Sequence, residues 1–352
     1  MAIELTNFEE AFAWLSEVKA AKPTPRLLLG NGFSIAYAPS RFSYTALRNQ
    51  AEDEGLLGPL ALHLFHKLNT QDFEIVIKTL EDAATGLEAL DSQKYASDIH
   101  EIRTEAGSVK EALAHILAAL HPERPNDIDE EAYLQVRTFL DRFQAIYTAN
   151  YDLLLYWTLM QDFTDRGLPP RRHDDGFRDP GYPADHVVWD HLKPHHGNVH
   201  YLHGALHLYR GDQGIKKLTW RRTDIALIDQ IRDQLNAGAF PLYVAEGTST
   251  EKLERIESSN FLGHALRSLA NTGGGLLAYG LSFSKNDKHI IDAVARSSIS
   301  RLAVSLFGDS ASPANQATIQ AVRDLQAARE AATTSKPLEI KFFTAGSVRL
   351  WS

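Results

Sequence analysis

The order of apolar and polar stretches along the chain predicts an α/β protein. Residues 26–30 (Arg-Leu-Leu-Leu-Gly) are an apolar run without alternation, which is typical of a strand buried on both faces of a sheet. Later strands are expected at 145–149, 199–203, 241–245, 275–279, 302–307 and 338–343, with helices at 251–270, 289–297 and 316–331. Strands separated by helices of this length predict parallel crossovers. We therefore expect a doubly wound, mostly parallel, Rossmann-like sheet.

Residues 44–143 show helical periodicity and no strand pattern. Phe73, Val76 and Leu80 lie on one helical face. Ser108 and Glu111 have the spacing of a capping box, which predicts a helix start near 108. We expect a helical insertion at 44–143 in a Rossmann-like domain made of residues 1–43 and 144–352. Residues 166–198 are rich in Pro, Gly, Asp and His, which predicts a long loop or lid.

Composition narrows the function classes. Lys and Arg number 36 and Asp and Glu 45, a net charge of −9 that argues against nucleic-acid binding through a basic face. The chain has no Cys, which excludes disulfides, thiolate nucleophiles and Cys zinc ribbons. Its first residues are acidic and amphipathic, unlike a signal peptide, and no apolar stretch could span a bilayer. We expect a cytoplasmic protein with no membrane partner.

Polar clusters directly follow several of the predicted strands. They are Gly30-Asn31-Gly32-Phe33-Ser34, Thr148-Ala149-Asn150-Tyr151-Asp152, His203-Gly204, Gly247-Thr248-Ser249 and Gly280-Leu281-Ser282. Ligands of open parallel sheets bind beyond the carboxyl ends of the strands, so these clusters are expected to converge. Each also has a plain structural interpretation: a strand-to-helix turn for the first, helix capping for Asn150 and Asp152, and a hydrogen-bonded core residue for His203.

The first cluster and the histidines were compared with known nucleotide-binding, catalytic and metal-binding motifs. The third glycine of the dinucleotide fingerprint is replaced by Ile35, and a Walker A motif is absent. A strand-end His203 suits general-base catalysis, because the imidazole pKa lies near neutrality. A metal site is the rival interpretation, since one segment contains His186, His191, His195, His196, His200, His203 and His207. Without an H-E-x-x-H helix or a Cys partner, we favour no metal.

In this order, the motifs resemble those of the sirtuin-like NAD-consuming family, and most of all a bacterial branch of uncharacterised or defence-associated proteins. The segment from Gly280 to Asp287 and the Leu202-His203-Gly204 step carry much of the likeness. The resemblance implies that NAD binds in the cleft of a Rossmann-like sheet, and it gives a role to each motif. Gly30, Gly32 and Ser34 would hold the phosphates, Asn150 and Asp152 the nicotinamide ribose and carboxamide, His203 would be the base, and Gly280 and Ser282 would contact the adenosine side. Asn31, Thr148, Gly204 and Asp287 complete the expected cofactor-binding set.

Two departures from the protein deacylases of that family shape the functional expectation. The zinc ribbon is missing, and Ala38-Pro39-Ser40-Arg41 stands where a Pro-Asp-Phe-Arg motif is expected. Both favour water as the acceptor, so the expected reaction is hydrolysis of NAD⁺ to nicotinamide and ADP-ribose, with a role in antiviral defence. A non-catalytic NAD or ADP-ribose sensor and an NAD-dependent deacylase are the alternatives, and Gly247-Thr248-Ser249 is the alternative adenosine contact. A homo-oligomer, a regulatory partner protein or the candidate lid at 166–198 is the expected means of keeping such an activity off.

Overall fold

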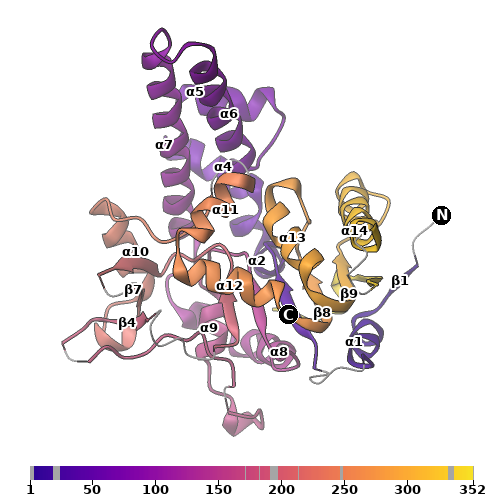
Figure 1. Ribbon diagram of the computed structural model, residues 1–352. Coiled ribbons are helices and arrows are strands. Elements are labelled where there is room, and N and C mark those ends of the chain that lie inside the picture. The colour runs from indigo at the N-terminus through magenta and orange to yellow at the C-terminus, as the bar shows by residue number, and fades with distance from the viewer. Residues whose placement is uncertain are drawn as a thin grey trace.

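The structure is a computed structural model that describes residues 4–18, 24–170, 172–181, 183–190, 197–212, 214–245, 249–331 and 337–351. Its centre is a seven-stranded sheet in which every neighbouring pair is parallel (Figure 1). In spatial order the strands are β1 (Leu5–Thr6), β10 (Glu339–Thr344), β9 (Ser298–Leu306), β8 (Gly273–Tyr279), β2 (Arg26–Leu29), β3 (Ile146–Thr148) and β5 (Val199–Tyr201). The expected Rossmann-like α/β fold is confirmed.

The strand order creates a switch point at the middle of the sheet. From β2 the chain moves outward through β3 to β5, then returns to β8 on the other side of β2 and continues to β9 and β10. Adjacent strands whose connections leave in opposite directions open a crevice at their carboxyl ends, which is where ligands of such sheets bind. The segments that follow β2 and β8 are therefore the first place to look for a site.

Helices cover both faces of the sheet. On one face, Phe139 of α8 (Glu130–Leu140) contacts Phe8 of α1 (Phe8–Ser16) and Tyr279 of β8. On the other face, the Tyr147 hydroxyl of β3 contacts Ser268 of α12 (Asn260–Ala270). Through Leu28 of β2, Tyr147 is in register with Ala278 of β8, the residue before Tyr279. Because successive strand residues point to opposite faces, Tyr147 and Tyr279 lie on opposite faces of the sheet. α12 packs in turn against α13 (Lys288–Arg296), and α13 against α14 (Pro313–Ala331).

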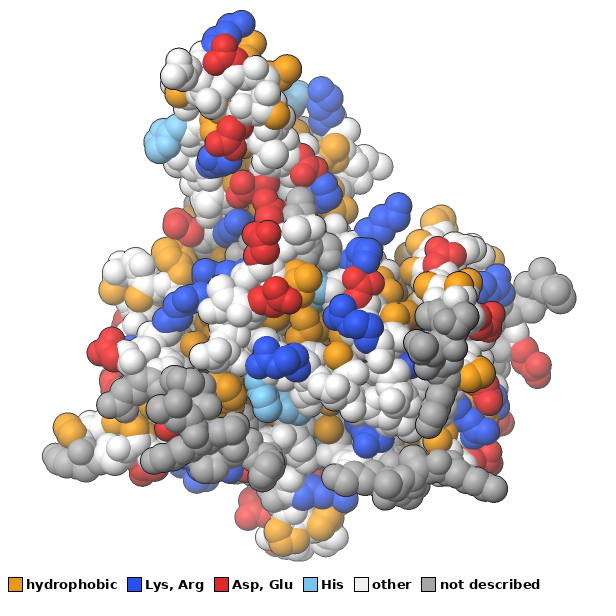
Figure 2. All heavy atoms as spheres, in the orientation of Figure 1, with side chains coloured by type: hydrophobic (Ala, Val, Ile, Leu, Met, Phe, Trp, Pro, Cys, Tyr) orange, Lys and Arg blue, Asp and Glu red, His pale blue; other side chains and the backbone are white. Residues whose placement is uncertain are grey.

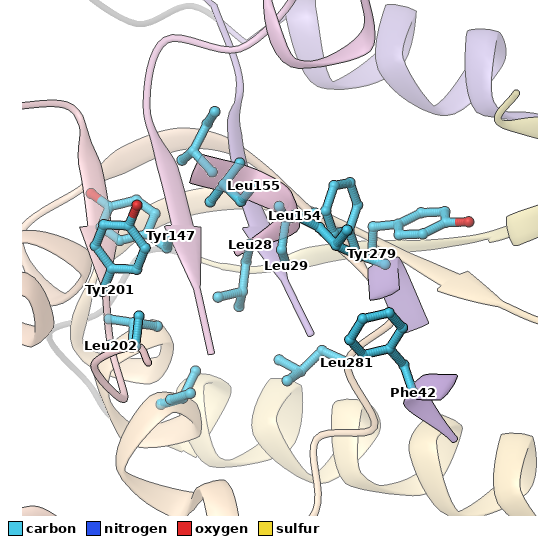
Figure 3. Packing of buried hydrophobic residues seen from close by; sticks show 14 of the residues in the cluster. Leu28, Leu29, Phe42, Tyr147, Leu154, Leu155, Tyr201, Leu202, Tyr279 and Leu281 are labelled. Carbon is cyan, nitrogen blue, oxygen red and sulfur yellow. The ribbon is translucent and has the colours of Figure 1, made fainter. Parts of the chain in front are cut away.

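The core explains why the central strands lack alternation. Leu27, Leu28 and Leu29 are all fully buried, because both faces of β2 are covered. Figure 3 shows Leu28 and Leu29 among Tyr279, Leu154 and other apolar side chains. Leu154 begins α9 (Leu154–Met160), a short helix that is buried over nearly all of its length. The centre of the sheet is thus a rigid base for the loops at its carboxyl edge.

The region 44–143 contains helices and no strand. They are α4 (Tyr44–Asp53), α5 (Pro59–Lys67), α6 (Phe73–Asp91), α7 (Ala96–Leu120), the 3₁₀ turn η1 (Pro125–Asp127) and α8. α5, α6 and α7 project away from the sheet (Figure 1), whereas α8 packs on it. The helix start predicted near Ser108 is wrong: α7 runs through it, and the Ser108 hydroxyl donates to the Thr104 carbonyl. The apolar face of α7 already includes the buried Ile99 and Ala106, which precede Ser108. Packing of this face therefore overrides the local capping signal.

A second, smaller sheet lies beside the first. It is antiparallel and contains β4 (His186–Trp189), β7 (Gly214–Leu218) and β6 (Leu208–Gly211). The prediction that 166–198 is a loop throughout is therefore wrong for β4, whose backbone pairs with β7. The strand expected at 241–245 is also wrong, because Tyr243 forms only an isolated bridge with Gly204. The single helix expected at 251–270 is two, α11 (Ser249–Glu257) and α12, because the Ser259 side chain caps a new helix.

The remaining elements are short and lie outside the two sheets. They are α2 (Gly32–Tyr37), α3 (Pro39–Phe42), η2 (Thr164–Arg166), η3 (Trp220–Arg222), α10 (Leu227–Asn236), η4 (Lys285–Asp287) and η5 (Ala345–Ser347). None of the described helices is both long and apolar enough to cross a membrane. On the face drawn in Figure 2, basic and acidic side chains are interspersed rather than gathered in one basic patch.

Candidate functional site

Three glycines bring the loops after β2 and β8 into backbone contact at the switch point. A Cβ on Gly32 would lie 2.5 Å from the Gly280 Cα, and one on Gly30 would lie 2.5 Å from the Gly280 carbonyl oxygen. Gly280 itself has a φ of +67°, and the Gly32 amide donates to its carbonyl. Close packing therefore accounts for these glycines, and the amides of Gly30 and Gly32 are already used within the protein.

A buried hydrogen-bonded network joins the ends of β2 and β3. The Ser34 hydroxyl, in the first turn of α2, donates to Asp152 Oδ2 (2.5 Å) and accepts from Asn150 Nδ2 (2.9 Å). Asp152 Oδ1 also accepts from the amide of Leu154, the first residue of α9. Burial raises the pKa of Asp152, and the hydrogen bonds from Ser34 and the backbone oppose that rise. Asn150 Oδ1 is buried and has no hydrogen-bond partner among the described residues.

His203 lies directly after β5 and faces a second histidine. Its Nε2 is 2.8 Å from Nε2 of His289, near the start of α13, and its ring also hydrogen-bonds with the Ala149 backbone. Burial, with the nearby Lys252 ammonium, lowers the pKa of His203 well below its ordinary value. Burial likewise lowers the pKa of His289, to about 2. Both rings are neutral near pH 7, so His203 is in the form that can accept a proton.

A buried ion-pair cluster next to His203 was missed by the sequence analysis. The fully buried Lys252 places Nζ 2.7 Å from Glu74 Oε2 and 3.5 Å from Asp287 Oδ1. The Tyr151 hydroxyl lies 3.0 Å from Glu74 Oε1 and 2.6 Å from the Val244 carbonyl oxygen. Burial raises the pKa of Glu74, and although burial opposes the charge on Lys252, the two carboxylates raise its pKa. One signal was available: Lys252 lies four residues before the buried Ile256, on the apolar face of α11.

Asp72 extends this acidic cluster. It is the N-cap of α6 and accepts a hydrogen bond from the Glu74 amide. Burial, followed by repulsion from Glu74, raises the pKa of Asp72 to about 7. The ammonium of Lys252 therefore pairs with two carboxylates, those of Glu74 and Asp287, and the carboxyl group of Asp72 lies beside them in a largely buried region.

The remaining predicted residues have varied surroundings. Thr148 Oγ1 accepts from the Asn150 amide, and Asn31 Nδ2 donates to the Phe42 carbonyl. Gly204 has a φ of +78°, and a Cβ there would lie 1.9 Å from the Leu242 carbonyl oxygen, so this position also requires glycine. Ser282 is exposed. The alternative contacts Gly247 and Thr248, and the histidines at 191, 195 and 196, lie outside the described residues.

The structure thus places the predicted residues in two groups at one edge of the sheet. Ser34, Asn150 and Asp152 form one group, and His203 with Asp287 belongs to the other. No side-chain hydrogen bond among the described residues joins the groups, but the Tyr151 ring, next to Asn150 in sequence, stacks at 6.1 Å on the His203 ring. Asn150 is 7% and His203 2% exposed, so both groups are buried in this conformation. None of these residues lines the cavity of about 500 Å³, whose lining is Ser40, Arg41, Ala119, Leu120, His121, Pro122, Glu123 and Asp127.

Comparison with known families adds one finding. Residues 27–351 match the model of a family described as a domain of unknown function, DUF4917. The chain belongs to the DUF4917 family. The DUF4917 match begins in β2 and ends beyond β10, so it includes both groups of candidate residues and the helices of the insertion. No curated protein matches the chain.

Proposed function

We propose that this DUF4917 protein hydrolyses NAD⁺ to nicotinamide and ADP-ribose. The observation that carries the proposal is that the Ser34–Asn150–Asp152 group and the His203 group lie at the same edge of the sheet, beyond the carboxyl ends of β2, β3 and β5. This edge adjoins the switch point of the sheet, where dinucleotides bind in folds of this strand order. The resemblance of the same motifs to sirtuin-like sequences supports the choice of NAD⁺ over other dinucleotide chemistry.

The reaction breaks the bond between the ribose C1′ and the nicotinamide nitrogen. The bond's electron pair leaves with nicotinamide, which becomes neutral, and the ribose acquires oxocarbenium character. A water oxygen then adds to C1′, and His203 Nε2 accepts the proton that this water loses. The unpartnered Oδ1 of Asn150 is suited to accept a hydrogen bond from a ribose hydroxyl or the attacking water, while Ser34 and Asp152 hold the amide in position. In the conformation described, His289 occupies the Nε2 side of His203, so substrate must displace it.

The test is release of nicotinamide and ADP-ribose from NAD⁺ by purified protein, followed by chromatography. We expect turnover by the wild type and a loss of ~10²–10⁴-fold in His203→Ala, the range typical of a positioned base. His200→Ala is the matched control, since it removes another buried histidine, one that lies in β5 and bonds to Ser268. Thermal unfolding of both variants separates lost catalysis from lost folding.

The outcomes also separate the alternatives. Product formation by His203→Ala at the wild-type rate would remove His203 from the mechanism. NAD⁺ binding by calorimetry without any nicotinamide would favour the sensor. Nicotinamide release that requires an acylated peptide would favour the deacylase, and the hydrolase proposal would then fail.

A further inference from the structure

Three metal-ligating side chains from separate segments converge beside the candidate base. His203 follows β5, Asp287 ends η4, and His289 lies in the first turn of α13. One donor atom from each lies within 4.8 Å of the other two. The closest pair is Nε2 of His203 and Nε2 of His289, at 2.8 Å, and Asp287 Oδ1 is 3.7 Å from His203 Nε2. Two imidazoles and a carboxylate therefore point at one small volume.

Two polar atoms of this cluster have no hydrogen-bond partner among the described residues. The ring of His203 hydrogen-bonds with the Ala149 backbone, and its Nε2 atom faces Nε2 of His289. His289 is almost completely buried, yet its Nδ1 has no partner among the described residues. Asp287 Oδ1 also makes no hydrogen bond within the described part of the chain. Buried polar atoms without partners are uncommon in folded proteins and need an explanation.

The charges around the three side chains favour a cation. Glu74 and Asp287 pair with the ammonium of Lys252, and the carboxyl group of Asp72 lies close enough to Glu74 to be repelled by it. The other titratable groups next to them are the hydroxyls of Tyr44 and Tyr151 and the ring of His203. Lys252 lies closer to Glu74 (2.7 Å) than to Asp287 (3.5 Å), so Asp287 is the less neutralised of its two partners. A divalent cation next to Asp287 would offset this excess of negative charge.

We propose that His203, Asp287 and His289 bind a divalent transition metal of the zinc class. Imidazole nitrogens with one carboxylate suit Zn²⁺ and Co²⁺, whereas Mg²⁺ and Ca²⁺ prefer all-oxygen ligands. The hydrogen bond from His203 to the Ala149 carbonyl is the kind of outer contact that orients a metal-ligating histidine. A metal on His203 Nε2 would prevent that atom from accepting a proton. The metal would therefore inhibit NAD⁺ hydrolysis, and this last consequence rests on the proposed function.

The binding test uses Zn²⁺ calorimetry and Co²⁺ absorption spectra on protein first treated with a chelator, without NAD⁺. We expect one Zn²⁺ per chain at this site, weakened by at least about 10–100-fold in Asp287→Asn and in His289→Gln, since even outer-contact changes cost that much. His186→Ala is the control, because His186 belongs to the His-rich segment but lies in β4 and pairs with Asp185. Thermal unfolding shows whether each variant folds, and the Co²⁺ spectrum of the wild type tests for nitrogen ligands independently of any variant.

Absence of Zn²⁺ binding, wild-type affinity in folded Asp287→Asn, or loss of binding in His186→Ala alone would overturn the site. Metal bound at these residues in a protein that does not turn over NAD⁺ would support the site and remove only the proposed function. Full turnover of NAD⁺ with Zn²⁺ bound would overturn the inhibition.

Discussion

Replacing Lys252 with methionine would remove the ammonium that pairs with Glu74 and Asp287, while keeping the length of the side chain. Lys252 is fully buried, and Glu74 and Asp287 are only 16% and 14% exposed. At the observed 2.7 Å between Nζ and the Glu74 oxygen, Coulomb attraction is about 6 kcal/mol at an effective dielectric constant of about 20. Desolvation of both groups offsets much of that attraction in the intact pair, but the loss of one partner leaves the other buried and uncompensated.

We therefore expect Lys252→Met to lower the free energy of unfolding by about 3–5 kcal/mol, the range for breaking a buried ion pair. Urea unfolding followed by tryptophan fluorescence and circular dichroism measures this change. Lys288→Met is the matched control, because Lys288 forms an exposed i,i+4 pair with Asp292 and is itself 64% exposed. Its effect should stay below about 0.5 kcal/mol.

A double variant tests the reason for the loss. Lys252→Met combined with Glu74→Gln removes both charges of the closer pair, so it should cost clearly less than the sum of the two single changes. The reasoning is refuted if Lys252→Met costs no more than Lys288→Met, or if the two changes at 252 and 74 are simply additive.

Two further predictions concern stability. Burial lowers the pKa of His121 and of His200 to about 4 each, so between about pH 6.5 and 4 the unfolded chain binds protons that the folded chain does not. The free energy of unfolding should thus fall as the pH falls through that range, by up to ~1.4 kcal/mol per pH unit for each histidine. Denaturant titrations at several pH values should show that the free energy of unfolding depends less steeply on pH in His121→Gln. An unchanged pH dependence would count against the assignment to His121. Gly32→Ala should destabilise the protein by at least about 1–3 kcal/mol, because its Cβ would overlap the backbone of the loop after β8. The control Gly107→Ala, in α7, places its Cβ in open space and should be neutral or stabilising by up to ~1 kcal/mol in thermal melts. Equal effects of the two changes would show that the contact at Gly32 is not close.

The sequence was informative where a local pattern decides the structure. Three consecutive leucines in β2 are buried on both sides, and the apolar run alone indicates this. At 241–245 a similar run misleads, because Leu242 and Val244 donate to carbonyls of Leu208 and His203 without forming a ladder. β4 was missed since its pairing with β7 depends on contacts about thirty residues away.

The same division holds for the candidate site. Residues that directly follow strands were found, since parallel strands bring their carboxyl ends to one edge. Glu74, Lys252 and His289 were not found. Their contacts are made between helices far apart in the sequence, α6, α11 and α13, so no local spacing in the sequence predicts them. The glycine at 32 was expected at a phosphate, and the structure shows that its contact with Gly280 is reason enough for a glycine there.

The ion pair of Glu74 with Lys252 makes the two ends of α6 differ in how much change they tolerate. The first turn of this helix is tied to the edge of the sheet, while the far end carries Leu90, which is 75% exposed. The distal end of the α6–α7 hairpin can therefore be lengthened, shortened or changed in sequence at little cost, but a deletion that reaches residue 74 would remove the nearest partner of the buried Lys252 ammonium. A deletion designed for crystallisation should therefore be made at the turn between α6 and α7, residues 92–95.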